Sequence, residues 1–386
     1  MISVFDKKED CCGCTACKSI CPTQAITMKP DKEGFLYPVI NQELCIDCGK
    51  CRQVCTFQIK QILSDRLHKP QVFAVKHNDI VRMNSASGGA YTAISDYVLK
   101  FSGVIYGVEF DDGFYVRHNR GTTVEEREKF KGSKYIQSDL RETFRQVEKD
   151  LILGNIVLFV GTGCQVAALK MYLLVKKINI NNLITTDIIC HGVPSPLLWQ
   201  DYLKFIQKES ELKSYTFRYK RKGWRGYNVK AEFKNGKTKI DSIDVRVFAN
   251  IFSSDLALRL SCYKCQFANL LRSSDITIGD FWGIEKSLPE IDDNKGVSLV
   301  IVNTYKGKRI FQEIKNELQV WESNIQDCLQ PNLLYPTKKP KEREKFWQDY
   351  YKFGFKYIAK KYAGFNFKTK IKRSLKGLLK NMSLIK

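Results

Sequence analysis

The chain has 386 residues, 44% of them hydrophobic and 27% charged, a composition typical of a globular protein of two or three domains. No run of 18 uninterrupted apolar residues occurs, so we expect no membrane-spanning helix, and the N-terminus lacks the apolar segment of a secretory signal. The 14 cysteines therefore favour metal ligands in a reducing cytoplasm over a disulfide scaffold, and part of the net charge of +22 is expected to offset negative metal–thiolate clusters.

A cysteine repeat opens the chain. Two runs of four cysteines with the same 2-2-3 spacing begin 34 residues apart. Such runs hold iron–sulfur clusters, and the fourth cysteine of each run binds the cluster of the other run. The sequence thus predicts two [4Fe–4S] clusters, one on Cys11, Cys14, Cys17 and Cys55, the other on Cys45, Cys48, Cys51 and Cys21. We predict residues 1–62 as a small α+β ferredoxin domain of the bacterial type.

Two features of this repeat leave alternatives. Zinc is the other metal to consider, although zinc sites usually use two pairs of cysteines rather than two runs of four. Cys12 lies outside the spacing and is interpreted as a bystander, with a redox role as the alternative. Thr56 stands where the motif usually has a second proline, which is not a ligand.

An alternation of strands and helices follows residues 61–70, which we interpret as a linker. Six β-branched runs predict strands at 72–77, 103–110, 155–161, 183–190, 275–280 and 297–304. Helical patterns occupy 91–101 and 165–177, so a larger α/β domain is expected. Residues 228–243 resemble a hairpin that turns at Asn235–Gly236.

Five further blocks carry a family resemblance: SASGGAYTAI, KFKGSKYIQSD, FVGTGCQVAAL, DIICHGVPSP and LSCYKCQF…SSDITIGDFWG. Together with the ferredoxin repeat they resemble the family of coenzyme F420 hydrogenase/dehydrogenase beta subunits over about residues 1–305. The family includes flavin-bearing subunits of deazaflavin-using hydrogenases and formate dehydrogenases, and reductases of chlorophyll intermediates. Other members belong to bacterial surface-polysaccharide gene clusters. One departure is Gly163, where the family usually has proline before the cysteine.

The resemblance implies that the α/β domain binds FAD, with 70–150 and 151–335 as its two parts. A glycine pair at a helix start can hold a pyrophosphate through backbone N–H groups, although a plain turn is the alternative. The basic loop near Lys131 adds cations and a ring, unless it is simply solvated. The predicted cofactor-binding residues are Ser87, Gly88, Gly89, Lys131, Ser133, Lys134, Tyr135, Gly161, Thr162 and Gln165.

Four later cysteines form a candidate third metal set: Cys164, Cys190, Cys262 and Cys265. Cys164 and Cys190 follow predicted strands, where parallel sheets present ligand-binding loops. Four thiolates fit a third [4Fe–4S] cluster, which the resemblance also favours, while buried free thiols and a zinc site are alternatives. Cys328 lies outside every block and is expected to be structural. His191 is a candidate proton donor near the flavin, or a packed residue.

These features predict an oxidoreductase that passes electrons between [4Fe–4S] clusters and FAD to reduce a small substrate, with surface-polysaccharide synthesis as one setting. A beta subunit that reduces coenzyme F420 is the alternative enzyme, and a non-catalytic electron relay is the third hypothesis. We expect an external donor, either a ferredoxin- or flavodoxin-like protein or a partner oxidoreductase subunit.

Residues 336–386 are predicted as a basic amphipathic tail. From Tyr350 onward the chain has eleven Lys or Arg and no Asp or Glu, with aromatic and aliphatic residues between them. Such a segment is typical of an interfacial helix on anionic lipid at the inner face of the membrane, or of a solvated extension. Nucleic-acid binding is disfavoured because no recognition motif accompanies the charge.

Overall fold

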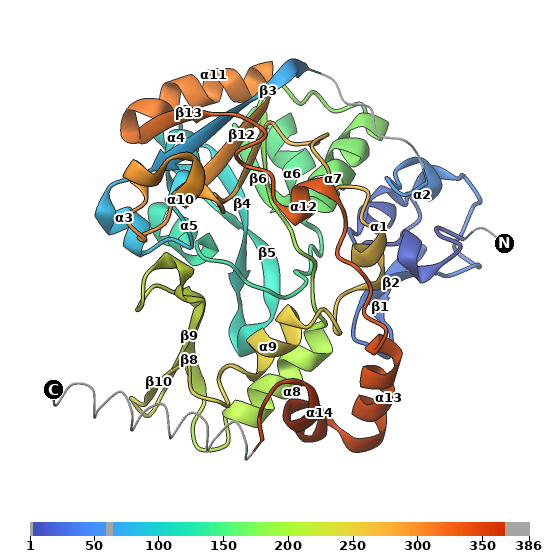
Figure 1. Cartoon of the computed structure of the whole chain (residues 1–386). Coiled ribbons are helices and arrows are strands. Elements are labelled where there is room, and N and C mark those ends of the chain that lie inside the picture. Colours follow the sequence, from blue (N-terminus) through green and yellow to red (C-terminus); the bar gives the residue numbers. More distant parts are fainter. Residues whose placement is uncertain (1–2, 59–64, 367–386) are drawn as a thin grey trace, which may run out of the picture.

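The computed structural model describes residues 3–58 and 65–366, and it begins with a small domain at one side of the molecule (Figure 1). Strands β1 (Ile26–Pro30) and β2 (Leu36–Ile40) form an antiparallel pair. Short helices flank the pair: η1 (Lys8–Asp10), α1 (Ala16–Ile20) and α2 (Lys50–Gln53). This small α+β unit is the fold that the cysteine repeat predicts.

An eight-stranded sheet runs through the body of the molecule in the order β13-β3-β12-β11-β7-β6-β4-β5. Its strands are β3 (Arg66–Lys76), β4 (Val104–Phe110), β5 (Val116–Gly121), β6 (Val157–Thr162), β7 (Leu183–Ile188), β11 (Ile276–Asp280), β12 (Ser298–Thr304) and β13 (Gln319–Ser323). The four strands β11, β7, β6 and β4 run parallel, and the strands outside them pair antiparallel.

The α/β prediction and all six expected strands are confirmed. The two edge strands β5 and β13 were not predicted, because their short segments VRHNRG and QVWES are polar and lack a run of β-branched residues. The linker prediction was wrong over residues 66–70, which begin β3. Pro70 is accommodated there because the pairing of β3 with β12 shifts register between Arg66 and Gln71.

Helices cover both faces of this sheet. Helices α4 (Ala90–Lys100) and α11 (Tyr305–Ile314) pack on one face through a cluster that includes Ile94 and Phe311. Helices α6 (Thr143–Ile152) and α7 (Gly163–Val175) cover the other face. The hydrophobic cluster of this second face continues into α1, so the small domain packs directly against α6 and α7.

A second lobe lies below the sheet in the view of Figure 1. It combines a three-stranded sheet, β10-β9-β8, with helices around a core that contains Trp199, Tyr202 and Phe248. Its elements are α8 (Pro196–Ile206), β8 (Leu212–Tyr219), β9 (Asn228–Phe233), β10 (Thr238–Ile240), α9 (Val247–Ser253), α13 (Arg343–Phe353) and α14 (Phe355–Tyr362). The predicted turn at Asn235–Gly236 joins β9 to β10, and Gly236 has the left-handed φ of 82° that such a turn needs.

Short elements complete the described part: α3 (Asp79–Met83), η2 (Asp112–Phe114), α5 (Val124–Phe130), η3 (Trp224–Gly226), η4 (Leu260–Lys264), α10 (Ile284–Ser287), η5 (Pro289–Ile291), η6 (Lys315–Glu317) and α12 (Pro331–Leu334). The division expected between 150 and 151 runs through one continuous sheet. Within the described residues, no helix is both long and apolar enough to cross a membrane.

The beginning of the predicted tail is part of the folded body. Helices α13 and α14 bury Phe346, Phe355 and Ile358 in the core of the second lobe. Asn250 of α9 donates a hydrogen bond of 2.8 Å to the backbone carbonyl of Ala363. The rest of the predicted basic segment, 367–386, lies outside the described residues.

Buried polar contacts fix the small domain against the body. Arg343 of α13 donates two hydrogen bonds to the carboxylate of Glu33 and another, of 3.0 Å, to the carbonyl of Leu258. Arg145 of α6 donates to the carbonyl of Ser19 over 3.0 Å. The small domain is therefore docked in one orientation by contacts from both α6 and the C-terminal helix pair.

Candidate functional site

The backbone of both cysteine runs has left-handed residues at the same positions. Gly13 and Thr15 in the first run have φ angles of 70° and 62°, and Asp47 and Gly49 in the second run have 56° and 70°. These residues hold equivalent positions, immediately before and after the second cysteine of each run. Alternating right- and left-handed residues aim successive N–H groups into a concavity that suits anions and iron–sulfur clusters. The backbone thus repeats along with the cysteine spacing.

The first predicted set lines a single small cavity in the N-terminal domain: Cys11, Cys14, Cys17 and Cys55. The rest of its wall is mainly apolar and includes Val4, Phe5, Met28, Pro38 and Phe57. Burial and the neighbouring thiols raise the pKa of Cys17 well above its usual value and that of Cys55 to about 11. Thiols that resist ionisation here become thiolates when a metal supplies the compensating charge, so the donor set fits a metal cluster.

The second predicted set lies nearer to solvent. Burial, followed by the neighbouring Cys48 and Cys45, raises the pKa of Cys51. Cys21 and Cys51 both pack against the hydrophobic cluster that the small domain shares with α6 and α7. Cys48 is exposed, and Leu44 and Ile46 beside it are 50% and 64% exposed. An external one-electron donor can therefore approach this set directly.

The four later cysteines, although far apart in sequence, are brought together in the body. Cys164 begins α7 just after β6, Cys190 follows β7, and Cys262 and Cys265 belong to η4 and its end. Burial first, and then the neighbouring Cys262, Cys164 and Cys265, raises the pKa of Cys190 well above its usual value. Burial also raises the pKa of Cys262 to about 12 and that of Cys265 to about 11. The parallel neighbours β6 and β7 thus present two of these thiols at the same edge of the sheet, as the sequence predicts.

These sets differ from a site for one metal ion. Among residues 3–58 and 65–366, no three His, Cys, Asp or Glu side chains lie close enough together to hold one ion. A [4Fe–4S] cluster differs from such a site, because its four ligands bind at separate corners of a cube of iron and sulfur.

Cys12 joins the first set to the third. Its buried thiol lies next to those of Cys14 and Cys164, and Cys12 is the largest cause that lowers the pKa of Cys164 to about 7. Thr162 Oγ1 also lies 3.1 Å from Cys164 Sγ. The sequence does not reveal this proximity, because the position of Cys12 next to Cys11 says nothing about which residues from other elements lie beside it.

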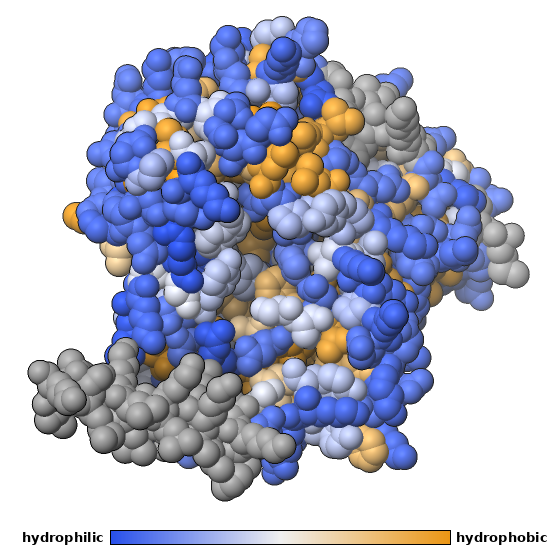
Figure 2. Space-filling view, in the orientation of Figure 1, coloured by the Kyte–Doolittle hydropathy of each residue, from blue (hydrophilic) through white to orange (hydrophobic). Residues whose placement is uncertain are grey.

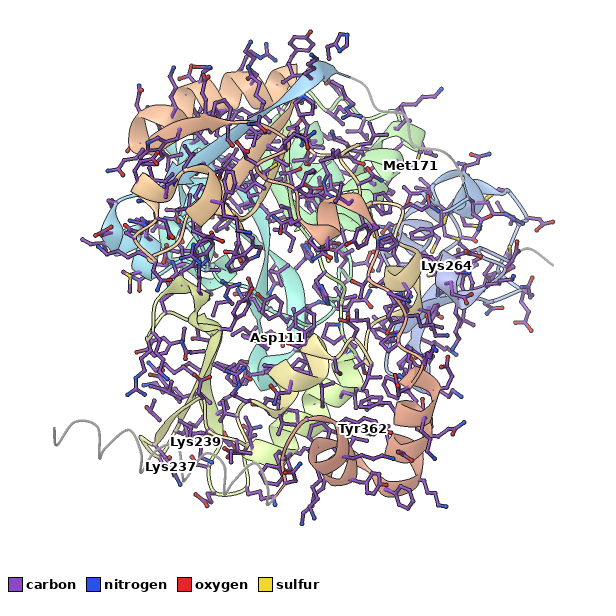
Figure 3. The ribbon with its side chains drawn as sticks, in the orientation of Figure 1. Asp111, Met171, Lys237, Lys239, Lys264 and Tyr362 are labelled. Atoms are coloured by element: carbon purple, nitrogen blue, oxygen red, sulfur yellow. The ribbon has the colours of Figure 1, made fainter. Side chains whose placement is uncertain are left out.

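The elements that carry the two sets are also packed together. Lys264 of η4 lies beside the small domain (Figure 3), where η4 contacts η1. The short segment that carries Cys262 and Cys265 is therefore packed against the segment that leads into Cys11. The first and third sets face each other across the boundary between small domain and body.

A large cavity of about 1210 Å³ lies between the β8–β9 hairpin, the end of the β4–β5 pair and two loops. The loops span 83–86 and 129–134, and Asp111, labelled in Figure 3, lines the cavity from the end of β4. Figure 2 shows a hollow on this side of the molecule, with hydrophobic residues on its floor and hydrophilic residues at its rim. The predicted residues Lys131, Ser133 and Lys134 are part of the cavity wall.

Basic side chains form part of the wall of this cavity. Lys134 Nζ donates to the carbonyls of Lys129 and Lys131, and burial lowers the pKa of Lys134 to about 7. Lys220 Nζ donates to three carbonyls, and burial lowers its pKa to about 7 as well. Arg218 pairs with Asp280 over 2.8 Å. A ligand with a pyrophosphate group suits this wall, and only part of the wall was predicted from the sequence.

Ser87 and Gly88 use their polar groups inside the protein. Ser87 Oγ donates to the carbonyl of Val297, and the Gly88 N–H donates to Ser298 Oγ over 2.8 Å. Gly89 has a φ of 93° and caps the start of α4. These three residues follow the 83–86 wall of the cavity, but Ser87 and Gly88 direct the hydrogen bonds just named into the sheet and the loop before it.

Gly161, Thr162 and Gln165 belong to the neighbourhood of the third cysteine set. Thr162 and Gln165 form a capping box at the start of α7, and Gln165 Nε2 donates to Ser138 Oγ over 2.9 Å. None of the three lines the large cavity. The structure thus divides the predicted cofactor residues between two places.

His191 pairs with Asp255, with 2.5 Å between Nε2 and Oδ1, and does not line the large cavity. An aromatic chain links it to that cavity. The His191 ring lies edge-on to Phe252, which stacks on Tyr135 with 4.7 Å between centroids. Tyr135 in turn lies edge-on to Phe217 of the cavity wall at 5.3 Å. This chain spans the distance between the Cys190 side and the cavity side.

Cys328 has the structural place expected for it. It is fully buried in a hydrophobic cluster, and its thiol donates to the carbonyl of Ile325. Three cavity residues, Arg218, Tyr219 and Lys220, were not predicted, although the basic run RYKRK was a visible signal. Arg272, in the last sequence block, pairs with buried Asp187 rather than lining the cavity.

Two family models match the chain. Residues 10–59 match a 4Fe-4S dicluster domain, which covers the cysteines of the first two sets. Residues 154–327 match the C terminus of the coenzyme F420 hydrogenase/dehydrogenase beta subunit, which covers the third set. All twelve cysteines assigned to a set therefore fall within a matched region.

Individual proteins resemble the chain as well. It is 20% identical over 333 residues to one of the subunits of the F(420)H(2) dehydrogenase of Methanosarcina mazei, covering 81% of this chain and 84% of that protein. Over 46 residues it is 39% identical to an uncharacterized ferredoxin of Methanocaldococcus jannaschii, which is 12% of this chain and 25% of that protein. A solved structure of the F420-reducing [NiFe] hydrogenase complex from Methanosarcina barkeri matches with a TM-score of 0.46 and 18% identity, over 67% of this chain and 84% of that chain.

Proposed function

Because this chain belongs to the family of coenzyme F420 hydrogenase/dehydrogenase beta subunits and carries an N-terminal 4Fe–4S ferredoxin domain, we propose that it exchanges electrons between iron–sulfur clusters and a deazaflavin through bound FAD. A flavin supplies the conversion between hydride transfer and single electrons that clusters alone lack. The observation that carries the proposal is the contact of Cys12 with both Cys14 and Cys164, since it joins the ferredoxin domain to the body.

The order of the three cysteine sets and the cavity supports one path for the electrons. The second set includes the exposed Cys48, the first set includes the buried Cys17, and the set around Cys164 follows across the domain boundary. The aromatic chain from His191 to Tyr135 then leads to the cavity. Electrons can pass between one-electron carriers in such a row without a conformational change.

The cavity suits the second half of the proposal. At about 1210 Å³ it exceeds the roughly 300–1,000 Å³ of most small-molecule sites, which leaves room for a dinucleotide and a second ring. Lys131 and Lys134 would hold a pyrophosphate, while Arg218 lies over the ring of Tyr227 at 4.6 Å and offers a flat cationic surface. Ser133 offers a further hydroxyl to the same ligand.

The deazaflavin alternative has better support than reduction of a sugar precursor. The relative from M. mazei belongs to an F420H2 dehydrogenase, and no described residue of the cavity points to a sugar or to polysaccharide synthesis. By the same analogy, we propose that partner subunits supply or remove electrons at the exposed second set. A pure relay without flavin is the remaining alternative.

Cofactor content tests the proposal. Protein purified without oxygen should contain about twelve irons, about twelve sulfides and one FAD per chain. The Cys262→Ser variant should lose about four irons and keep the other eight, because the third cluster loses one of its four thiolate ligands. The Cys328→Ser variant is the matched control, since it removes a buried thiol outside every set and should keep all twelve.

Each outcome has a clear reading. Eight irons in the wild-type protein would remove the third cluster, and zinc in place of iron would overturn the relay. Absence of flavin, together with no reduction of the deazaflavin by chemically reduced protein, would leave the non-catalytic relay. Iron and flavin in full amount without any deazaflavin reduction would contradict the substrate.

A further inference from the structure

One arginine is buried at the boundary where the first and third cysteine sets meet. Arg259 is completely buried, and it lies three residues before Cys262, whose backbone N–H donates to the carbonyl of Arg259 over 2.9 Å. Its side chain points the other way, into the small domain. It thus belongs by its backbone to the third set and by its guanidinium to the first.

The guanidinium is fixed by contacts with the segment of the first set. Its Nε donates to the carbonyl of Cys11 over 2.8 Å and one Nη to the carbonyl of Leu36 over 2.9 Å. The same Nη lies 3.5 Å from Cys11 Sγ. The other Nη donates to Gln137 Oε1, and Gln137 in turn donates to the carbonyl of Cys12. One N–H group therefore faces a predicted cluster ligand.

The surrounding residues leave no freedom to move. The guanidinium lies over the ring of Tyr37 at 4.2 Å and over that of Phe35 at 5.5 Å. A side chain at Gly13 would come within 2.9 Å of it, which explains the glycine at this point of the first run. The position of the charge relative to Cys11 is therefore fixed.

No carboxylate of the described residues forms an ion pair with Arg259. The titratable groups that act on it most strongly are the thiols of Cys11, Cys12 and Cys262 and the phenol of Tyr37. A buried cation without a counter-ion is costly, because transfer out of water removes its hydration. The thiolates of the bound clusters, which are anions, are the available counter-charge.

We propose that Arg259 tunes the first cluster: its fixed positive charge and its N–H group toward Cys11 Sγ raise the reduction potential of the cluster on Cys11, Cys14, Cys17 and Cys55. This inference rests on the proposed clusters. Reduction adds one electron, taken from a one-electron donor at the exposed set, and moves no atom. The added negative charge then lies beside a cation in a water-poor interior, where the attraction is strong. Arg259 is thus a positioning and tuning residue for the step between small domain and body.

Redox titration of the whole protein, followed by electron paramagnetic resonance, tests this role. In Arg259→Gln the equilibrium constant for reducing the first cluster should fall at least tenfold, which is ~59 mV for a one-electron couple. The reduction potential of the second cluster should not shift. In Arg259→Lys, which keeps the charge but not the planar guanidinium, the equilibrium constant for reducing the first cluster should fall less. The signal of the first cluster is the one lost in Cys55→Ser.

A second buried arginine provides the control. Arg343 also anchors the small domain, but its hydrogen bonds go to Glu33 and the carbonyl of Leu258 rather than to a sulfur. The double variant Arg343→Met with Glu33→Gln removes this anchor without leaving one buried charge alone. It should leave the potential of the first cluster unchanged. An equal shift in this variant would assign the effect to looser docking and overturn the tuning role.

The remaining outcomes separate this inference from the proposed function. Wild-type protein without iron would contradict the clusters themselves. Full iron in wild type and Arg259→Gln with equal potentials would overturn the tuning role alone. If Arg259→Gln fails to hold the first cluster, the test rests on Arg259→Lys. A first-cluster potential in Arg259→Lys that equals or exceeds that of the wild type, with full iron content, would overturn the inference. Loss of the first cluster from both variants would make Arg259 an assembly residue and overturn it as well.

Discussion

At the scale of single residues, the same amino acid serves different purposes at different places. Gly13 leaves space for Arg259, and Gly236 allows a left-handed turn in open solvent. Gly88 belongs to neither case, because a Cβ atom there would lie 2.3 Å from the carbonyl oxygen of Val75 and 2.4 Å from the nitrogen of Ser298. Both atoms are backbone of paired strands, so neither can turn aside.

We expect Gly88→Ala to destabilise the protein by about 3 kcal/mol, at the upper end of overpacking, because β3 and β12 would have to move. The matched control is Gly236→Ala, which meets no atom within 4 Å and should cost about 1 kcal/mol, the strain of one left-handed alanine. Urea unfolding under nitrogen measures both. Loss of flavin from Gly88→Ala without loss of stability would instead make this glycine a cofactor contact.

Cys12 shows a different limit at this scale. The 2-2-3 spacing identifies ligands because each gap is a local matter of a few bonds. Cys12 gains its meaning from Cys164, which is 152 residues later and arrives on another element. No local pattern contains that information.

At the scale of elements, the helix pair α13–α14 depends on one buried carboxylate. Asp349 of α13 accepts hydrogen bonds from Lys361 Nζ at 2.6 Å and from the Tyr362 hydroxyl at 2.8 Å, both near the end of α14. Lys345 lies 3.3 Å from its other oxygen. These contacts, with Lys361 first, lower the pKa of Asp349 from 3.8 to about 2. Tyr362 is labelled in Figure 3.

A lowered carboxyl pKa stabilises the folded state above the unfolded pKa and stops doing so as the pH falls toward the folded one. We therefore expect Asp349→Asn to lower the urea midpoint at pH 7, and expect this deficit to shrink between about pH 4 and about pH 2. Midpoints at pH 7 and pH 3, after short incubation, give the comparison. A deficit of equal size at both pH values would mean that the charge of Asp349 does not stabilise the pair.

At the scale of the whole molecule, charge and shape divide the protein into regions. The described body contains the three cysteine sets and the cavity, while the sequence of residues 367–386 contains seven Lys or Arg and no Asp or Glu. Cationic residues near an anionic membrane surface contribute about 1 kcal/mol each, and apolar residues between them add burial. Contact of this segment with anionic lipid therefore remains our proposal for it.

Deletion of residues 367–386 should reduce co-sedimentation with phosphatidylserine-containing liposomes at least tenfold, because it removes seven positive charges. Added salt should weaken the binding of the full chain. The control is Lys234→Ala with Lys237→Ala, which removes cations from the β9–β10 hairpin that are paired with Glu211 and Glu209. Unchanged binding after the deletion would contradict the lipid proposal.

The sequence by itself determined the two cysteine runs of the ferredoxin domain, the α/β class and six strands of the large sheet. Each of these is a local matter, because ligand spacing follows from bond lengths and a buried strand follows from a run of β-branched residues. The polar edge strands β5 and β13 were not predicted, since their place is set by a neighbouring strand and not by their own composition.

Only the tertiary structure decided how these parts work together. It brought Cys164, Cys190, Cys262 and Cys265 to one place, closed the cavity with the β8–β9 hairpin, and divided the predicted cofactor residues between two regions. It also placed Arg259 against Cys11, 248 residues away in the sequence. Such contacts depend on how the packed elements meet, which is set by the whole fold and not by any local sequence pattern.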